Sequence, residues 1–138
     1  MNVLIDTNVI LDAMLSRSPF NEAAQKLFIM AAEEKINAYI TANCITDIYY
    51  ILQKYLHDAT RCKEELRKLF TLFNIMDITV SDCRRALELP INDYEDALLA
   101  ACAKRRKIEY IITRNVKDFN NSPVKAVSPD DFLRLLLA

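Results

Sequence analysis

The sequence contains no glycine at all and only one histidine. The lack of glycine excludes several well-known sites, because Walker loops, G-x-G-x-x-G dinucleotide turns and G-x-S-x-G nucleophile elbows all require this residue. The four cysteines lie far apart and include no C-x-x-C pair. Together with the single histidine, this spacing argues against a zinc site and against a disulfide framework, and it favours a reduced, cytoplasmic setting.

An excess of charge of one sign is also lacking, since 18 lysines and arginines face 19 aspartates and glutamates. Proteins that bind nucleic acid through a broad basic face usually carry a net positive charge, so any such contact here must depend on a local arrangement. No apolar run approaches the length of a membrane span, and the first residues lack the basic region of a signal peptide. We therefore expect no membrane partner and a single domain over residues 1–138.

Short apolar runs alternate with segments of helical periodicity along the chain. The apolar runs predict β-strands at residues 3–5, 37–41, 75–79 and 110–113, with a fifth at 124–127. Helices are expected directly after residue 6, at 18–34, 43–56, 60–73, 81–89 and 93–104, and from 128 onward. Continuous apolar strands between helices are typical of a parallel sheet that is covered on both faces. The sequence thus predicts an α/β protein with three α/β/α layers and a central parallel sheet of four to five strands.

Aspartates follow the predicted strands or begin the helices after them. Because the carboxyl ends of parallel strands share one edge, these acids are expected to converge on one rim of the sheet, where ligands bind in such folds. Taken singly, the acids at helix starts are also explained by the helix dipole and by capping. The converging acids are Asp6, Asp47, Asp93, Asp96 and Asp118.

Several carboxylates on one rim repel one another and raise the pKa of at least one member. A bound divalent cation removes this unfavourable interaction. Carboxylate oxygens are preferred ligands of Mg²⁺ and Mn²⁺, whereas the scarcity of histidine and of paired thiols disfavours zinc. The sequence therefore predicts a site for Mg²⁺ or Mn²⁺.

Four segments occur in a set order along the chain: LIDTNVILDAM, ITANCITDIYYIL, DYEDALLAACA and IITRNVKDF. Together they resemble the sequence blocks of the PIN-domain ribonucleases, which include the VapC-type toxins of toxin–antitoxin pairs. The third segment resembles the branch with a D-x-E-D-A-L motif, and the resemblance runs nearly end to end. It implies a metal-dependent endoribonuclease with an RNA substrate, a small antitoxin partner and a homodimeric state.

The resemblance also implies roles for individual residues. Asp6 and Asp96 are expected to bind the metal directly, and Asp93 and Asp118 are expected to complete the set of metal-binding acids. Together with Asp47, these residues are expected to form the catalytic site. The chain departs from the family pattern at two positions. Asp47 replaces a longer glutamate, so it is expected to reach the metal through water. Asn115 stands where the family often has aspartate, which leaves Asp118 to supply the charge.

Four further polar residues are expected to support the acids. Thr7 and Asn8 are positioned to hydrogen-bond the carboxylates or the phosphate, although capping of the first helix is the simpler role for Asn8. Thr113 and Asn115 follow the fourth strand on the same rim.

Two groups of basic residues could contact RNA phosphates. Arg114 directly follows the end of the fourth strand and is the better placed of the two, whereas Arg17 and Lys117 are weaker candidates. The Lys104–Lys107 run lies at the far end of the helix that begins near Asp96, where cations and a solvated turn are the simpler explanation.

Other functions remain open on the sequence alone. The same scaffold could carry a DNA-directed nuclease, since no residue pattern here identifies the 2′-hydroxyl of RNA. A non-catalytic RNA- or protein-binding module is supported by Asp47 and Asn115. A phosphoacceptor signalling domain is disfavoured, because Asp6 is not followed by a second acid after the first strand.

Overall fold

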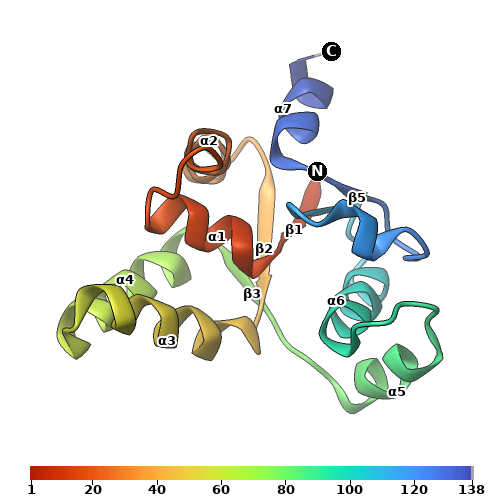
Figure 1. Cartoon of the computed structure of the whole chain (residues 1–138). Helices are drawn as coiled ribbons and strands as arrows, with labels where there is room; N and C mark the ends of the chain where they lie inside the picture. The colour runs from red at the N-terminus through yellow and green to blue at the C-terminus, as the bar shows by residue number, and fades with distance from the viewer. Residues whose placement is uncertain (138) are drawn as a thin grey trace.

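The computed structural model describes residues 1–137, which form five strands, seven α-helices and one short 3₁₀-helix (Figure 1). Ala138, the last residue of the predicted domain, lies outside the described residues. In chain order the elements are β1 (Asn2–Ile5), α1 (Thr7–Met14), α2 (Asn21–Ala32), β2 (Asn37–Thr41), α3 (Cys44–Leu56), α4 (Ala59–Leu72), β3 (Asn74–Met76), α5 (Val80–Glu88), α6 (Tyr94–Arg105), β4 (Tyr110–Ile112), the 3₁₀-helix η1 (Val116–Phe119), β5 (Ala126–Val127) and α7 (Pro129–Leu137).

The five strands form one sheet in the order β3-β2-β1-β4-β5, and every neighbouring pair is parallel. The chain runs outward from β1 to β3 and then returns to place β4 on the other side of β1. This change of direction makes the β1–β4 edge a topological switch point, where the loops that leave the two strands separate and open a crevice.

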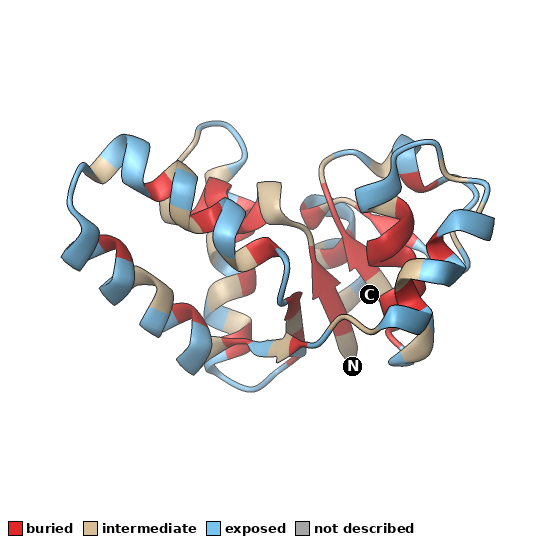
Figure 2. Ribbon diagram, turned by 90° about the horizontal axis from the view of Figure 1, so that it is seen from below, coloured by how far each residue is buried: buried red, intermediate tan, exposed pale blue. Residues whose placement is uncertain are grey.

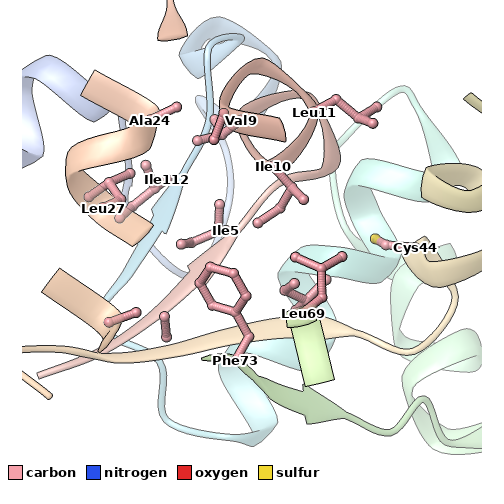
Figure 3. Close-up of a cluster of buried hydrophobic side chains, with 14 of the residues drawn as sticks. Ile5, Val9, Ile10, Leu11, Ala24, Leu27, Cys44, Leu69, Phe73 and Ile112 are labelled. Carbon is pink, nitrogen blue, oxygen red and sulfur yellow. The ribbon is translucent and has the colours of Figure 1, made fainter. Parts of the chain in front are cut away.

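Helices cover both faces of the sheet, so the predicted three-layer α/β/α architecture is confirmed. Successive strand residues point to opposite faces: Val3 and Ile5 belong to the core under α1–α4 and α7, whereas Leu4 belongs to the core under α5 and α6. Figure 2 shows the buried strands between the helical layers, and Figure 3 shows the first core, with Ile5 and Ile10 near Phe73. Burial of each such large side chain stabilises the fold by roughly 1.5–3 kcal/mol.

Several predicted element boundaries are wrong by a few residues, including the start of the fifth strand, which begins at Ala126 rather than at Val124. The second helix begins at Asn21 rather than at Ser18–Pro19, which form part of the preceding loop. The third strand ends at Met76, because this edge strand pairs with β2 only up to that residue. The fifth predicted helix, α5, is capped by Thr79 instead of Ser81.

The start of α5 shows why Thr79 forms the cap. The Thr79 hydroxyl accepts a hydrogen bond from the Asp82 amide at 3.1 Å, and the Asp82 carboxylate accepts one from the Thr79 amide at 3.0 Å. This reciprocal capping box satisfies two backbone donors that a helix start otherwise leaves without partners.

Asp82 also joins α5 to α6 through a buried ion pair. Its side chain is fully buried, and Arg105 donates to both carboxylate oxygens at 2.9 Å. Burial alone raises the pKa of Asp82, but hydrogen bonds from Arg105 and the Thr79 amide outweigh that effect and lower the pKa to about 2. The expectation that the Lys104–Lys107 run is merely solvated is therefore wrong for Arg105.

Among residues 1–137, no helix has both the length and the apolar character that crossing a membrane requires.

Candidate active site

Asp6 lies at the switch point of the sheet, directly after β1. Its carboxylate accepts a hydrogen bond from the Thr7 amide at 2.8 Å and another from the Thr113 hydroxyl at 2.8 Å. Thr113 directly follows β4 and is fully buried. The backbone amide of Asp6 also donates to the Ile112 carbonyl at 2.9 Å. These bonds fix the carboxylate between the ends of two neighbouring strands.

The pKa of Asp6 is raised above its ordinary value, chiefly by burial. The hydrogen bonds from Thr113 and Thr7 lower it in part, while the nearby charge of Asp118 raises it and that of Arg114 lowers it. The hydrogen bonds therefore hold the Asp6 carboxylate in place, but they do not fully offset the unfavourable effect of burial on its negative charge. A cation at this rim would supply the missing compensation.

Asp96 stands in the first turn of α6, where its amide donates to the Asp93 carboxylate at 3.0 Å. Burial raises the pKa of Asp96 to about 6, with further contributions from the negative charges of Asp93, Asp6 and Asp118. These four predicted site residues thus lie close enough for their charges to interact. The four acids come from three separate segments of the sequence, since only Asp93 and Asp96 are close together along the chain.

Asp96 is expected to destabilise the metal-free fold at neutral pH. Between pH 3.8 and about 6 the unfolded chain releases this proton before the folded protein does, so the free energy of unfolding falls as the pH rises. After discounting for solvent screening of a partly buried group, Asp96→Asn should stabilise the protein by about 1 kcal/mol at neutral pH.

Urea denaturation of both proteins in EDTA tests this expectation, and the difference should disappear below pH 3.8, where both side chains are uncharged. If Asp96→Asn instead lowered the free energy of unfolding at neutral pH, the negative charge of Asp96 would not be destabilising the metal-free fold.

A cavity of about 470 Å³ opens beside Asp96, between the loop that precedes α6 and the region of η1. The residues that line it are mostly polar: Pro90, Ile91, Asn92, Asp93, Asp96, Lys117, Asp118, Asn120 and Asn121. Three of the predicted acids therefore face a space large enough to admit part of a substrate.

Asp47 is less closely associated with this group. It is exposed in the first turn of α3, and its charge is not among the main contributions to the pKa of Asp6 or Asp96. Instead, the charges of Asp6 and Asp47 both raise the pKa of Cys44, after the larger effect of burial. The Cys44 thiol lies 2.9 Å from the hydroxyl of Thr41, within hydrogen-bonding distance.

Cys44 was not among the residues predicted for the site. Its raised pKa keeps the thiol protonated at neutral pH, and metal ligation requires the thiolate. The only sequence signal was its place shortly after the second strand, which does not distinguish it from a core residue.

Arg114, the predicted phosphate contact, is held by a buried acid on α1. Its Nε lies 2.7 Å from a carboxylate oxygen of Asp12, and its guanidinium stacks over the Phe20 ring at 4.2 Å. Arg17 binds the other oxygen of Asp12 at 2.9 Å, and Asp12 is only 1% exposed. This network fastens the segment after β4 to α1 and to the loop that follows it.

Asp12 was also missed from the sequence. The available signal was an acid inside the otherwise apolar helix segment Val9–Ala13, since a buried carboxylate requires a partner.

The remaining supporting residues lie next to the acids in different ways. Asp6 itself caps α1, so the expected capping role of Asn8 is wrong; the Asn8 side-chain oxygen is buried and has no hydrogen-bond partner within residues 1–137. The backbone amide of Asn115 donates to the Thr113 hydroxyl at 3.1 Å, and the backbone carbonyl of Asn115 accepts from the backbone amide of Asp118 at 3.0 Å. Asn115 thereby shapes the loop that carries Asp118.

The acids form an open arrangement that does not surround a metal position on all sides. Within residues 1–137, no three or more His, Cys, Asp or Glu side chains are grouped closely enough to hold a metal by themselves. Mg²⁺ is commonly bound by one or two carboxylates, with water and substrate phosphates completing its octahedron. The hard oxygen donors of Asp6 and Asp96, which carry raised pKa values, fit a site of that open type.

Thr113 is expected to control the orientation of Asp6. Thr113→Val keeps the shape of the buried side chain but removes the donor to Asp6, so the pKa of Asp6 should rise and any activity at this site should fall by roughly 10- to 100-fold. Thr113→Ser keeps the hydroxyl and is the matched control. Equal activity of the two variants would show that this hydrogen bond does not position the carboxylate.

Comparisons with known proteins agree with this fold. Residues 2–117 match the family described as the PIN domain. A sequence comparison with curated proteins gives no match. Among solved structures, a toxin–antitoxin complex from Klebsiella pneumoniae has 26% identity and a TM-score of 0.67, with 92% of this chain and 97% of that chain covered.

Two more distant structures share the fold. VapBC2 from Rickettsia felis, bound to a DNA fragment from its promoter, has 17% identity, a TM-score of 0.70 and coverage of 93% of this chain and 98% of that chain. VapC20 from Mycobacterium tuberculosis, a toxin that cleaves the sarcin–ricin loop, has 12% identity, a TM-score of 0.62 and coverage of 79% and 86%. Since the family match spans most of the sequence, the chain belongs to the PIN domain family.

Proposed function

We propose that this protein is an endoribonuclease that depends on Mg²⁺ or Mn²⁺ and serves as the toxin of a toxin–antitoxin pair. The observation that carries the proposal is the rim at the β1–β4 switch point, where the pKa of Asp96 is raised to about 6 by burial and by Asp93, Asp6 and Asp118. Membership of the PIN domain family supports a nuclease, and a sarcin–ricin loop cleaving relative supports RNA as its substrate.

In this proposal, Asp6 and Asp96 hold the ion, and Asp93 and Asp118 add negative charge around it. When bound, the ion lowers the pKa of a water molecule and neutralises charge on the scissile phosphate. Thr113 and the Thr7 amide keep the Asp6 carboxylate in one orientation, so that little rearrangement is needed when the substrate arrives.

The flanking residues have subsidiary roles in the proposal. Asp47 reaches the site through water, as expected for its short and exposed side chain. Arg114 remains bound to Asp12 through its Nε, which leaves its terminal nitrogens for an RNA phosphate. Asn115 orients the loop around Asp118.

The proposed partners and setting follow from the relatives and from the cysteines. A toxin–antitoxin complex among the similar structures supports an antitoxin partner, and we propose a homodimer of single-domain subunits. All four cysteines are free, which supports a reduced, cytoplasmic environment.

The proposal is tested by offering single-stranded RNA, structured RNA and DNA to the protein with Mn²⁺, with Mg²⁺ and with EDTA. We expect RNA cleavage that requires a metal ion. Cleavage of DNA alone would favour the DNA-directed alternative. RNA binding without cleavage in either metal would favour a non-catalytic module, which the exposed position of Asp47 would then help to explain.

A further inference from the structure

The cavity beside Asp96 has two walls that are joined by a direct contact. The side-chain amide of Asn121 donates to the Pro90 carbonyl at 3.4 Å, which links the segment after η1 to the loop before α6. Phe119, at the end of η1, is 3% exposed and anchors this wall in the core. The space of about 470 Å³ is therefore a preformed feature that extends outward from Asp96.

Among residues 1–137, most polar side chains that line the cavity have no hydrogen-bond or ion-pair partner. Within residues 1–137, the side chains of Asn92, Lys117, Asp118 and Asn120 make no hydrogen bond or ion pair, and Asp93 uses one carboxylate oxygen for the Asp96 amide. The cavity thus offers carboxylate acceptors, one ammonium donor and amides that can both donate and accept.

The charge of the cavity indicates which part of a nucleic acid it can accept. Three carboxylates face a single lysine, so a phosphate group would be repelled away from the metal position. The edge of a base is uncharged and carries N–H donors that carboxylates accept well. Since the lining includes no aromatic ring, recognition must depend on hydrogen bonds to that edge more than on stacking.

Guanine matches this set of groups better than the other bases do. Its Watson–Crick edge presents two neighbouring donors, N1–H and N2–H, which one carboxylate can accept together, next to the acceptor O6. Uracil presents a single donor between two acceptors, which would face the carboxylates unfavourably. Adenine and cytosine each present one donor group beside acceptors.

We propose that this cavity binds a guanine base next to the phosphate that the protein cleaves, with Asp118 accepting from N1–H and N2–H and with Lys117 and Asn120 donating to O6. The inference rests on the proposed ribonuclease function, because it defines the RNA sequence that this function would select. Lys117 and Asn120 are then specificity-determining residues.

The binding step is tested by NMR titration of the metal-free protein with guanosine monophosphate and with uridine monophosphate, which carry the same phosphate. We expect the side-chain amide signals of Asn92, Asn120 and Asn121 to shift with the guanosine nucleotide, and the uridine nucleotide to bind about 10-fold more weakly. Asn120→Ala and Lys117→Ala should each weaken guanosine monophosphate binding by roughly 5- to 10-fold. Lys125→Ala, an exposed lysine outside this cavity, should have no effect.

Equal affinity for the two nucleotides would overturn the inference. It would also fail if guanidinium ions shifted these amide signals while guanosine monophosphate did not, since the cavity would then suit a basic protein side chain.

Cleavage of a randomised single-stranded RNA gives an independent readout. Guanine should be enriched at one position flanking the cut, and Asn120→Ala should lower the ratio of kcat/KM between guanine and uracil substrates by roughly 10-fold. Metal-dependent RNA cleavage without any base preference would contradict the guanine site and leave the ribonuclease function intact. If no RNA is cut, the ribonuclease function fails, and the NMR titration still decides whether guanine binds.

Discussion

Replacing Asp6 with asparagine is expected to lower the rate of metal-dependent RNA cleavage by about 10³-fold. The substitution removes a negative charge from the switch point, so the affinity for the divalent cation falls. Asparagine is also a good N-cap, because its single side-chain oxygen can still accept the hydrogen bond from the Thr7 amide, while its side-chain NH₂ can donate to the Thr113 hydroxyl. The fold should therefore remain intact, and the loss should appear in single-turnover cleavage rates measured with saturating Mn²⁺.

Asp130→Asn is the matched control, because it makes the same chemical change on the exposed surface of α7. This variant should cleave RNA at the wild-type rate. Full activity of Asp6→Asn would remove Asp6 from the catalytic site. An equal loss in both variants would point to a general effect of surface charge.

Replacing Asp82 with asparagine is expected to reduce the free energy of unfolding by about 3 kcal/mol. The substitution removes the buried negative charge that pairs with the Arg105 guanidinium, so the positive charge of Arg105 loses its partner. The same ion pair predicts sensitivity to acid. The folded-state pKa of about 2 lies below the ordinary value of 3.8, so the stabilisation is present above pH 3.8 and is lost as the pH falls toward 2. This loss amounts to about 2 kcal/mol.

Urea denaturation of the wild type and the variant across this pH range measures both effects, and the difference in stability between the two proteins should shrink by up to about 2 kcal/mol toward the acid end. Asp77→Asn is the control: its side chain is 73% exposed, although it also contacts Arg105 and Arg106. It should change stability little. A wild-type protein whose stability does not change between pH 3.8 and 2 would show that the Asp82–Arg105 pair does not stabilise the fold.

The architecture could be predicted because short, mostly apolar strands alternate with helical segments along the chain. That pattern places Asp6 after β1 and Asp96 at the start of α6, and parallel topology brings such positions to one edge of the sheet. Local signals and a general rule of chain geometry were therefore enough to place these two acids near each other.

The side-chain partnerships could not be predicted in the same way. Asp12 and Arg114 are about a hundred residues apart and meet only because β4 lies beside β1. Arg105 contacts Asp82 because α5 packs against α6. Within the Lys104–Lys107 run, no feature of the sequence distinguishes Arg105 from its exposed neighbours. The sequence assigns residues to rims and faces, whereas these contacts depend on how the finished elements pack.

The central claim is that Asp6 and Asp96 hold a divalent cation at the switch point, and paramagnetic broadening by Mn²⁺ tests it most directly. In NMR spectra of the isotope-labelled protein, small additions of Mn²⁺ should first broaden the backbone amide signals of Asp6, Asp96 and Thr113. Asp96→Asn should weaken this broadening strongly. Broadening that starts instead at exposed acids such as Asp130 and Asp131, with the switch point unaffected, would contradict the account.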